Sequence, residues 1–402
     1  MDQPYPDRDA LEGAFARHVN RGKVEAYRAL GLHVVMGERE GARFADAYTG
    51  EWYWNCHCNG GVFNLGHRNP QVVAAVRDAL DHLDVGNHHL VSGWRAHLAE
   101  QLAATTGARL PSTVFGVSGG EAIDLALKLA RGHTHRRRIV SALGGYHGHT
   151  GYALAAGDAQ YRDPFGANLP DFVQVPFDDL AAMEAVVDDD TAAVILETIP
   201  ATLGFPMPSP GYLRAVGELC HERGALLVLD EVQTGLGRTG TVWSYEQDGA
   251  EPDMVVVGKG LGGGIYPITA TLLTAELHAF FDEHPFVHIS TFGGAELGCV
   301  AASTVLDIVT RPGFLARVGE LGERFERGLA GLPFEIRRRG LTMGLKFPTE
   351  SDGLVAAAQL IRNGVFAVFA NNDTSVVQCK PPLVVTDDEA DEIVDAIRKT
   401  FG

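Results

Sequence analysis

Short apolar runs alternate with longer segments of helical periodicity from about residue 115 onward, and this alternation limits the folds available to the chain. Such alternation is typical of βαβ units, in which crossover helices join parallel strands. Continuous apolar runs are expected where a strand is buried on both faces of a parallel sheet. Four runs are predicted to be strands, at residues 115–117, 193–196, 225–229 and 254–257. The sequence therefore predicts an α/β fold with a mostly parallel sheet.

Three of these four strands end directly on residues that can carry chemistry. They are followed by Ser118, by Asp230 and by Gly258-Lys259. In open α/β sheets, ligands bind in the crevice beyond the carboxyl ends of the strands. We therefore expect these residues to lie around one binding site.

The pattern changes after about residue 312. A long helix, two strands and a final helix are predicted at 315–329, 334–338, 343–347 and 387–400. A chain of 402 residues is long enough for a large domain and a smaller one. We predict an N-terminal segment that joins the small domain, a large ligand-binding domain and a small C-terminal α+β domain, at residues 1–52, 53–311 and 312–402.

Acidic residues outnumber basic ones by 51 to 33, which gives a formal net charge of −18. Such a charge repels phosphate backbones and anionic lipid surfaces. The N-terminus lacks the basic and then apolar order of a signal peptide, and no apolar run approaches the roughly 20 residues that a membrane helix needs. We expect a cytoplasmic protein that acts on small molecules, without nucleic acid or membrane partners.

The cysteines form an odd and sparse set in a chain large enough to fold without disulfides, so free thiols are expected. The five are Cys56, Cys58, Cys220, Cys299 and Cys379. The stretch Cys56-His57-Cys58 suggests metal ligands, but no second Cys/His pair follows at the spacing of a zinc site. We therefore predict no metal site.

Asp230 follows the apolar run 225–229, and a carboxylate at the end of a buried strand must be paired or have a shifted pKa. The protonated ring nitrogen of a pyridine cofactor is one suitable partner, because the ion pair makes the ring an electron sink. The alternatives are that Asp230 caps a nearby helix or pairs with Arg238.

Lys259 lies in a glycine-rich segment, residues 258–264, and glycines let a backbone approach a ligand closely. A lysine desolvated at such a site has a lowered pKa and is nucleophilic toward an aldehyde, as a Schiff-base lysine must be. The alternative is a glycine-rich turn that carries a solvated lysine.

A possible phosphate site is formed by Ser118-Gly119-Gly120-Glu121, between a predicted strand and a predicted helix at 123–129. Helix N-termini bind anions through N–H groups that have no partner within the helix. Similar turns occur in many α/β proteins without a ligand.

Together these motifs resemble those of the class III aminotransferases, which are pyridoxal-phosphate enzymes of fold type I. The resemblance extends over nearly the whole chain. Within the family, the chain is similar to the members that act on ornithine and ω-amino acids. The matching segments are Leu-Gly-His-Arg-Asn-Pro at 65–70, Ser-Gly-Gly-Glu at 118–121, Tyr-His-Gly at 146–148, Asp-Glu-Val-Gln-Thr-Gly at 230–235, Gly-Lys-Gly at 258–260 and Ser-Thr-Phe-Gly-Gly at 290–294. The resemblance implies a mostly parallel seven-stranded sheet in the large domain.

The resemblance also implies a role for each matching residue toward pyridoxal 5′-phosphate. Lys259 would form the Schiff base, Asp230 would pair with the ring nitrogen, and Gln233 would bond the ring hydroxyl. The other cofactor-binding positions are Ser118, Gly119 and Gly120 at the phosphate, Tyr146 and Val232 on the two ring faces, His147 in the ring-stacking segment, and Glu197 close by. Thr291 would reach the phosphate held by a partner subunit, which implies a homodimer with shared active sites.

The implied activity moves an amino group between an amino acid or ω-amine and a keto acid or aldehyde, with Lys259 as the acid and base. Alternatives within the fold are a racemase, epimerase, aminomutase or decarboxylase, because the same carbanion serves all of them. An alternative of another class is a non-catalytic protein that binds pyridoxal phosphate.

Three positions depart from the ornithine-type pattern. His149 replaces an arginine that often binds a carboxylate, Thr202 replaces a glutamate, and Gln378 replaces the arginine that pairs with this glutamate. A buried arginine is costly without its carboxylate, so the glutamate and the arginine are expected to be lost together. His149, Gln378, Lys380 or Arg338 could bind a carboxylate instead, although each taken alone is expected to be a surface or structural polar residue.

Overall fold

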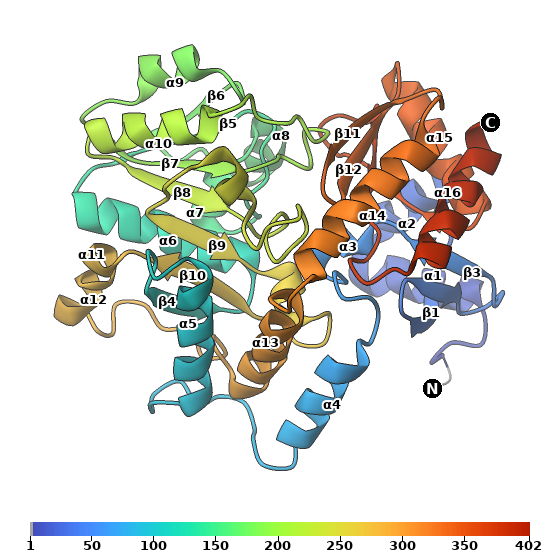
Figure 1. The fold of residues 1–402 in the computed structure, drawn as a ribbon, viewed down its shortest axis with the longest axis horizontal. Coiled ribbons are helices and arrows are strands. Elements are labelled where there is room, and N and C mark those ends of the chain that lie inside the picture. Colours follow the sequence, from blue (N-terminus) through green and yellow to red (C-terminus); the bar gives the residue numbers. More distant parts are fainter. Residues whose placement is uncertain (1–2) are drawn as a thin grey trace.

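The computed structural model describes residues 3–402 and contains one large sheet and two smaller ones (Figure 1). The large sheet has seven strands in the order β4-β10-β9-β8-β7-β5-β6. Neighbouring strands are parallel except β10, which runs antiparallel to β4 and β9. The bounds are β4 Ser112–Gly116, β5 Arg138–Ala142, β6 Phe172–Val175, β7 Thr191–Glu197, β8 Leu226–Asp230, β9 Met254–Val257 and β10 Thr269–Leu273. The predicted α/β fold with a mostly parallel sheet is confirmed.

The two smaller sheets have four strands each, in the orders β1-β2-β3-β13 and β11-β12-β15-β14. Their bounds are β1 Met36–Glu40, β2 Arg43–Asp46, β3 Trp52–Asn55, β11 Glu335–Arg339, β12 Thr342–Lys346, β13 Val365–Phe366, β14 Val368–Phe369 and β15 Val376–Cys379. Because β13 pairs with β3, the N-terminal strands are joined to the C-terminal part of the chain. This pairing supports our proposal that residues 1–52 belong with the small domain, although β3 itself crosses the proposed boundary at residue 52.

Helices lie around the large sheet and beside the small sheets (Figure 1). The helices that lie before β7 are α1 Arg8–Phe15, the π-helix η1 Ala16–Asn20, α2 Arg21–Ala29, α3 Cys58–Gly61, α4 Pro70–Ala79, α5 Gly93–Thr105, α6 Gly119–Thr134, α7 Gly151–Ala155, α8 Ala159–Arg162, the 3-10 helix η2 Asp163–Phe165 and α9 Leu180–Val186. After β7 follow α10 Tyr212–Glu222, η3 Ser244–Asp248 and η4 Lys259–Gly262 (both 3-10), α11 Ala275–His278, α12 Phe280–Glu283, α13 Glu296–Val309, α14 Phe314–Leu329, α15 Glu350–Arg362 and α16 Asp387–Phe401.

Within the described chain, no single helix is both long and apolar enough to cross a membrane; α13 and α14 meet these criteria only together, across a bend of 70°.

Each strand predicted from an apolar run is present, with bounds that differ by a few residues. The run 254–257 coincides with β9, and all of its residues are buried. Helix α6 begins four residues before its predicted start, since Ser118 accepts a hydrogen bond from the Glu121 amide and caps the helix. The two glycines in its first turn carry no apolar signal, so periodicity alone could not include them.

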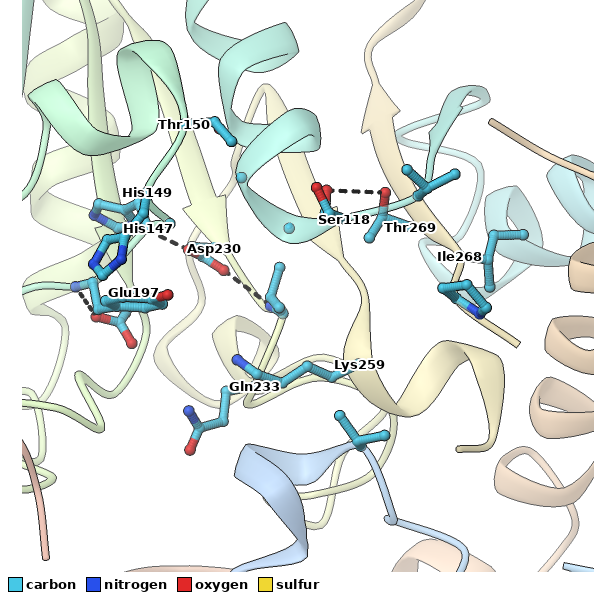
Figure 2. Close-up of a pocket in the computed structure, with 18 of the residues that line it drawn as sticks. Ser118, His147, His149, Thr150, Glu197, Asp230, Gln233, Lys259, Ile268 and Thr269 are labelled. Atoms are coloured by element: carbon cyan, nitrogen blue, oxygen red, sulfur yellow. Dashed lines mark hydrogen bonds and ion pairs between the residues drawn. The ribbon is translucent and has the colours of Figure 1, made fainter. Parts of the chain in front are cut away.

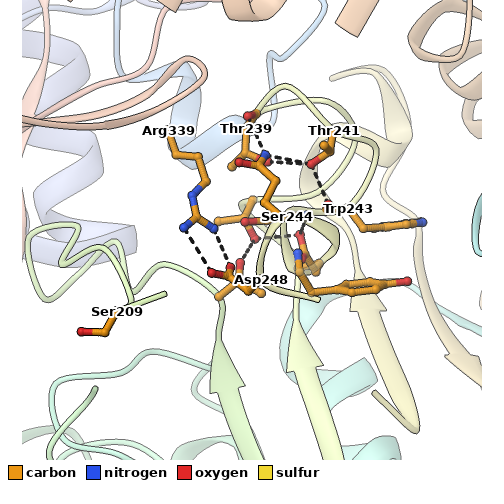
Figure 3. A network of polar contacts seen from close by, with 12 residues as sticks. Ser209, Thr239, Thr241, Trp243, Ser244, Asp248 and Arg339 are labelled. Carbon is orange, nitrogen blue, oxygen red and sulfur yellow. Dashed lines mark hydrogen bonds and ion pairs between the residues drawn. The ribbon is translucent and has the colours of Figure 1, made fainter. Parts of the chain in front are cut away.

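Two arginines connect the large domain to the C-terminal part of the chain. Arg238 is fully buried and donates to the side chain of Asn64 and to the carbonyls of Leu341 and Pro381. Arg339, at the end of β11, forms two hydrogen bonds with the Asp248 carboxylate in η3, at 2.6 and 3.4 Å (Figure 3). These contacts fix the two parts of the chain relative to each other.

We expect Arg339→Met to lower the free energy of unfolding by about 1–3 kcal/mol, because it leaves the buried Asp248 carboxylate without its cation. Arg327→Met is the matched control, since both members of the Arg327–Glu323 pair are mostly exposed. It should change the stability by less than about 0.5 kcal/mol. Urea denaturation measures both, and equal stabilities of the two variants would contradict this account.

Candidate active site

A cavity of about 570 Å³ lies at the carboxyl ends of the parallel strands (Figure 2). Its wall contains Val62, Val117, Ser118, Gly119, Gly120, Tyr146, His147, Gly148, His149, Thr150, Glu197, Asp230, Val232, Gln233, Lys259, Gly264, Ile265, Tyr266, Pro267, Ile268 and Thr269. Strand register accounts for part of this arrangement. Glu197 and Asp230 end the adjacent strands β7 and β8 and are register partners, and Lys259 follows β9 closely.

The structure brings ten of the eleven predicted site residues into this wall. They are Ser118, Gly119, Gly120, Tyr146, His147, Glu197, Asp230, Val232, Gln233 and Lys259. Thr291 does not line the cavity, because it lies on an exposed segment between α12 and α13. Its predicted role needs a second subunit.

Asp230 is buried and accepts a hydrogen bond from His147 Nδ1 at 2.9 Å. Its other oxygen accepts from the Val232 amide at 3.0 Å. Burial alone would lower the pKa of His147, but the hydrogen bond and the charge of Asp230 raise it above its ordinary value. The alternative pairing of Asp230 with Arg238 is wrong, since Arg238 bonds elsewhere. Sequence reasoning placed His147 at the site but missed its pairing with Asp230.

Lys259 has a left-handed backbone with φ of 44°, a conformation that costs energy for a residue with a Cβ. Glycines around it provide the room. A Cβ added at Gly60 would lie 3.2 Å from the Lys259 Cε atom, and one added at Gly258 would lie 2.8 Å from Thr269. Burial lowers the pKa of Lys259, although Asp230 and Glu197 oppose this shift. Lys259 is thus half-buried in the cavity wall, which favours the predicted site over the alternative of a fully solvated lysine.

Glu197 is buried at the end of β7 and accepts a hydrogen bond from the Tyr146 amide at 2.8 Å. Burial raises the pKa of this carboxyl to about 7, against the attraction of His147 and together with the repulsion of Asp230. Glu197 therefore changes charge near neutral pH.

The N-terminus of α6 points its first amides into the cavity. Within residues 3–402, neither the Gly119 nor the Gly120 amide donates a hydrogen bond. A Cβ added at Gly120 would lie 2.7 Å from the Thr150 Oγ1 atom, so this position has no room for a side chain. Free amides together with the positive end of a 16-residue helix suit a phosphate group.

Sequence reasoning missed one part of the wall, residues 265–269. This segment leads from η4 into β10, and the Thr269 hydroxyl donates to the Ser118 carbonyl at 3.4 Å. The apolar, β-branched run that forms β10 could have predicted the strand. Its antiparallel direction, which brings its first residue to the site, could not be read from the pattern.

Comparison with known proteins decides the family. The family model described as "Aminotransferase class-III" matches residues 25–401. An "Uncharacterized aminotransferase" from Archaeoglobus fulgidus is 51% identical over 394 residues, which cover 94% of this chain and 91% of that protein.

The chain belongs to the class-III aminotransferase family.

Solved structures agree with this assignment. An ornithine aminotransferase from Toxoplasma gondii ME49 is 27% identical and covers 99% of this chain and 96% of its own, with a TM-score of 0.90. A second structure of the Toxoplasma gondii enzyme, with partial occupancy of PLP at its active site, is 28% identical, with coverage of 99% and 98% and a TM-score of 0.85. An acetylornithine aminotransferase from Elizabethkingia anophelis is 26% identical, with coverage of 95% and 98% and a TM-score of 0.79. The protein is a fold type I aminotransferase that acts on small-molecule amines with pyridoxal phosphate.

Among residues 3–402, neither the five cysteines nor His57 belongs to the cavity wall. All five are free and buried. Within residues 3–402, no group of three or more His, Cys, Asp or Glu side chains could hold a metal ion.

We expect Glu197→Gln to remove a pH-dependent loss of stability from the cofactor-free protein. The folded carboxyl keeps its proton up to a pKa of about 7, whereas the unfolded one loses it at 4.5, so the wild type loses stability relative to the variant as pH rises between these values. Above pH 7 the difference should reach about 3 kcal/mol. Urea unfolding near pH 5 and pH 8 tests this, with exposed Glu218→Gln as the control. A stability difference between Glu197→Gln and wild type that stays constant with pH would refute it.

Proposed function

We propose that Lys259 holds pyridoxal phosphate as a Schiff base and moves the proton during amino transfer. The observation that carries this proposal is the position of its amine in a cavity that also contains the Asp230–His147 pair and the free amides of α6. The amine suits an aldehyde, the Asp230–His147 pair suits a protonated ring nitrogen, and the amides suit a phosphate. When bound, the cofactor supplies an electron sink for the pair left by loss of the substrate Cα proton.

In this proposal, Asp230 accepts a hydrogen bond from the ring nitrogen and keeps it protonated. The carboxylate is already oriented by His147 and by the Val232 amide. An anion fixed in this way needs no reorganisation when the ring binds. Tyr146 and Val232 line the cavity and would hold the two faces of the ring.

Gly119 and Gly120 would donate their amides to the phosphate, and the dipole of α6 would favour its negative charge. Ser118 fixes the start of the helix. Phosphate binding at this end leaves the Lys259 amine free to act at the substrate.

Once released from the cofactor, the Lys259 amine would take the proton from the substrate Cα. It would then donate this proton to a carbon of the cofactor. A lowered pKa increases the fraction of this amine that is unprotonated and can accept a proton. Glu197 has a pKa of about 7 and its charge acts on this amine. Loss or gain of its proton would therefore change the electrostatic environment of Lys259.

Substrate recognition is proposed to differ from that of ornithine-type members. Thr202 donates its hydroxyl to the Gly144 carbonyl, and the buried Gln378 side chain bonds Lys380. Neither position carries the charge that the ornithine-type pair would have. His149 lies in the cavity wall, with its ring near those of Tyr146 and Tyr161.

We expect Lys259→Ala to abolish turnover and the visible absorption band of the bound cofactor, because no other lysine lines the cavity within residues 3–402. The rate should fall by at least about a thousandfold. Lys399→Ala, on the exposed face of α16, should keep both properties. A panel of amines assayed with and without a keto acid measures transfer, and a variant that retains the band and turnover would refute the role of Lys259.

The homodimer is proposed from an exposed apolar surface beside the predicted partner-binding segment. This surface consists of Leu90, Val91, Phe286, Val287, Ile289 and Phe292, which are 52–103% exposed. Leu90, Val91, Phe286 and Ile289 line one hollow in the surface, and exposed apolar surface of this kind marks an interaction site. Thr291 lies on the same segment, so a second copy seated here would bring it toward another cavity.

We expect Phe286→Asp to weaken dimerisation by at least about tenfold, because it places a charge in the apolar surface. Phe165→Asp is the matched control, since Phe165 is 77% exposed and Phe286 is 78% exposed. Sedimentation velocity over a concentration series measures the dissociation constant. If both variants dimerise as the wild type does, this surface is not the interface.

We also propose a cytoplasmic location. Five free thiols in a chain of this size are the composition expected in a reducing compartment.

A further inference from the structure

We propose that Lys380 is a positioning residue for the cofactor site, which fixes the Gln233 amide so that its Nε2 donor faces the cavity. This inference rests on the proposed function, because it concerns the group that Gln233 would meet when Lys259 holds the cofactor.

Lys380 directly follows β15, and its side chain is fully buried. Its ammonium donates to Gln233 Oε1 at 2.6 Å and to Gln378 Oε1 at 2.5 Å, and it lies 5.3 Å from the centre of the Phe205 ring. Within residues 3–402, no carboxylate forms an ion pair with it. A buried cation with only neutral partners is costly, so its contacts with the two amide oxygens are energetically important.

The chemistry of the two side chains determines the orientation of Gln233. An ammonium has donors and no acceptor, whereas a glutamine amide has an acceptor at one end and donors at the other. With Oε1 turned to Lys380, Nε2 must point away from it. A flipped amide would place two donors against the ammonium, at a cost of about 1–3 kcal/mol.

The Nε2 end of Gln233 lies beside Lys259. A Cβ added at Gly60 would lie 3.8 Å from Gln233 Nε2 and 3.2 Å from the Lys259 Cε atom. Figure 2 shows both side chains extending into the same space. Within residues 3–402, Nε2 donates no hydrogen bond to the protein, so it is free for a ligand.

Lys380 is itself held by the small sheet. Gln378 Nε2 donates to the Phe369 carbonyl on β14 at 3.2 Å, which fixes the Gln378 oxygen toward Lys380. The Lys380 amide donates to the Cys56 carbonyl at 2.5 Å. The strand β15 therefore determines which end of Gln233, in the turn after β8, is presented to the cavity.

A donor at this point stabilises the ionised form of the ring hydroxyl, whereas an acceptor would stabilise the protonated form. With the cofactor bound, the ionised hydroxyl would attract the Schiff-base proton, and a hydrogen bond from Gln233 to that oxygen would weaken the attraction. Lys380 should therefore lower the pKa of the Schiff base. Its positive charge acts in the same direction.

Several other ionisable groups surround these lysines. Burial, Lys259 and Arg238 lower the pKa of Lys380, while Cys58 and Cys379 oppose this shift. An uncharged amine would still have two N–H donors for the two glutamine oxygens, but its lone pair could also accept from a flipped amide, so the orientation of Gln233 is fixed fully by the ammonium form.

His57 is near both lysines, and burial together with their charges lowers its pKa to about 3, so it stays neutral during a titration at higher pH. Asp230 and Glu197 face Lys259. Glu197 titrates near pH 7, and comparison between variants cancels this contribution.

The test is a pH titration of the visible absorption band of the holoenzyme. We expect Lys380→Met to raise the pKa of the Schiff base by about 0.5–1 unit, the equivalent of one hydrogen bond. Lys380→Arg should restore a value close to that of the wild type, and Lys380→Gln should give a smaller shift than Lys380→Met. Lys346→Met is the matched control, because Lys346 lies on the same small sheet but bonds Asp373 and Ser375.

The titration is repeated in a Gln233→Ala background, where the effect of Lys380→Met should fall to less than half. The inference is overturned if Lys380→Met and Lys380→Gln leave the pKa unchanged, if the shift persists in full without Gln233, or if Lys346→Met produces it as well. If Lys380→Met does not fold, Lys380→Gln and Lys380→Arg decide the same question. A wild type without a Lys259-dependent band would instead refute the proposed function.

Discussion

A carboxylate buried at the end of a strand needs a partner, and His147 supplies one to Asp230 at 2.9 Å. This bond holds the segment after β5 against β8, and register with β7 places Glu197 beside it. The acidic side of the cavity is thus fixed by the sheet and by one histidine. The other parts of the site, the α6 amides and Lys259, take their places around this anion because their strands end at the same edge.

The site brings charges of opposite sign together. The N-terminus of α6, the Lys259 amine and the two carboxylates of Glu197 and Asp230 line one cavity, and both carboxylates act on the charge of the lysine. Burial raises the pKa of the Glu197 carboxyl, and the charges of His147 and Asp230 act on it in opposite directions. Such an arrangement suits a cofactor that carries a phosphate at one end and a protonated ring nitrogen elsewhere.

Buried and half-buried cations also connect the small sheets to the large domain. Arg238 bonds backbone carbonyls near the start of β12 and the end of β15, and Arg339 bonds Asp248. Lys380 extends this series into the wall of the active site through Gln233. The orientation of a cofactor-facing amide therefore depends on strands that are distant in sequence.

The sequence by itself determined the strands, the edge where they end and the residues that follow them, since burial on both faces requires continuous apolar runs. It also predicted ten of the residues in the cavity wall. Only the tertiary structure decided that Asp230 pairs with His147 and not with Arg238, and that Lys380 is a buried partner of Gln233. Local pattern cannot specify these contacts, because they join residues 83 and 147 positions apart whose geometry depends on the packing between strands and between sheets.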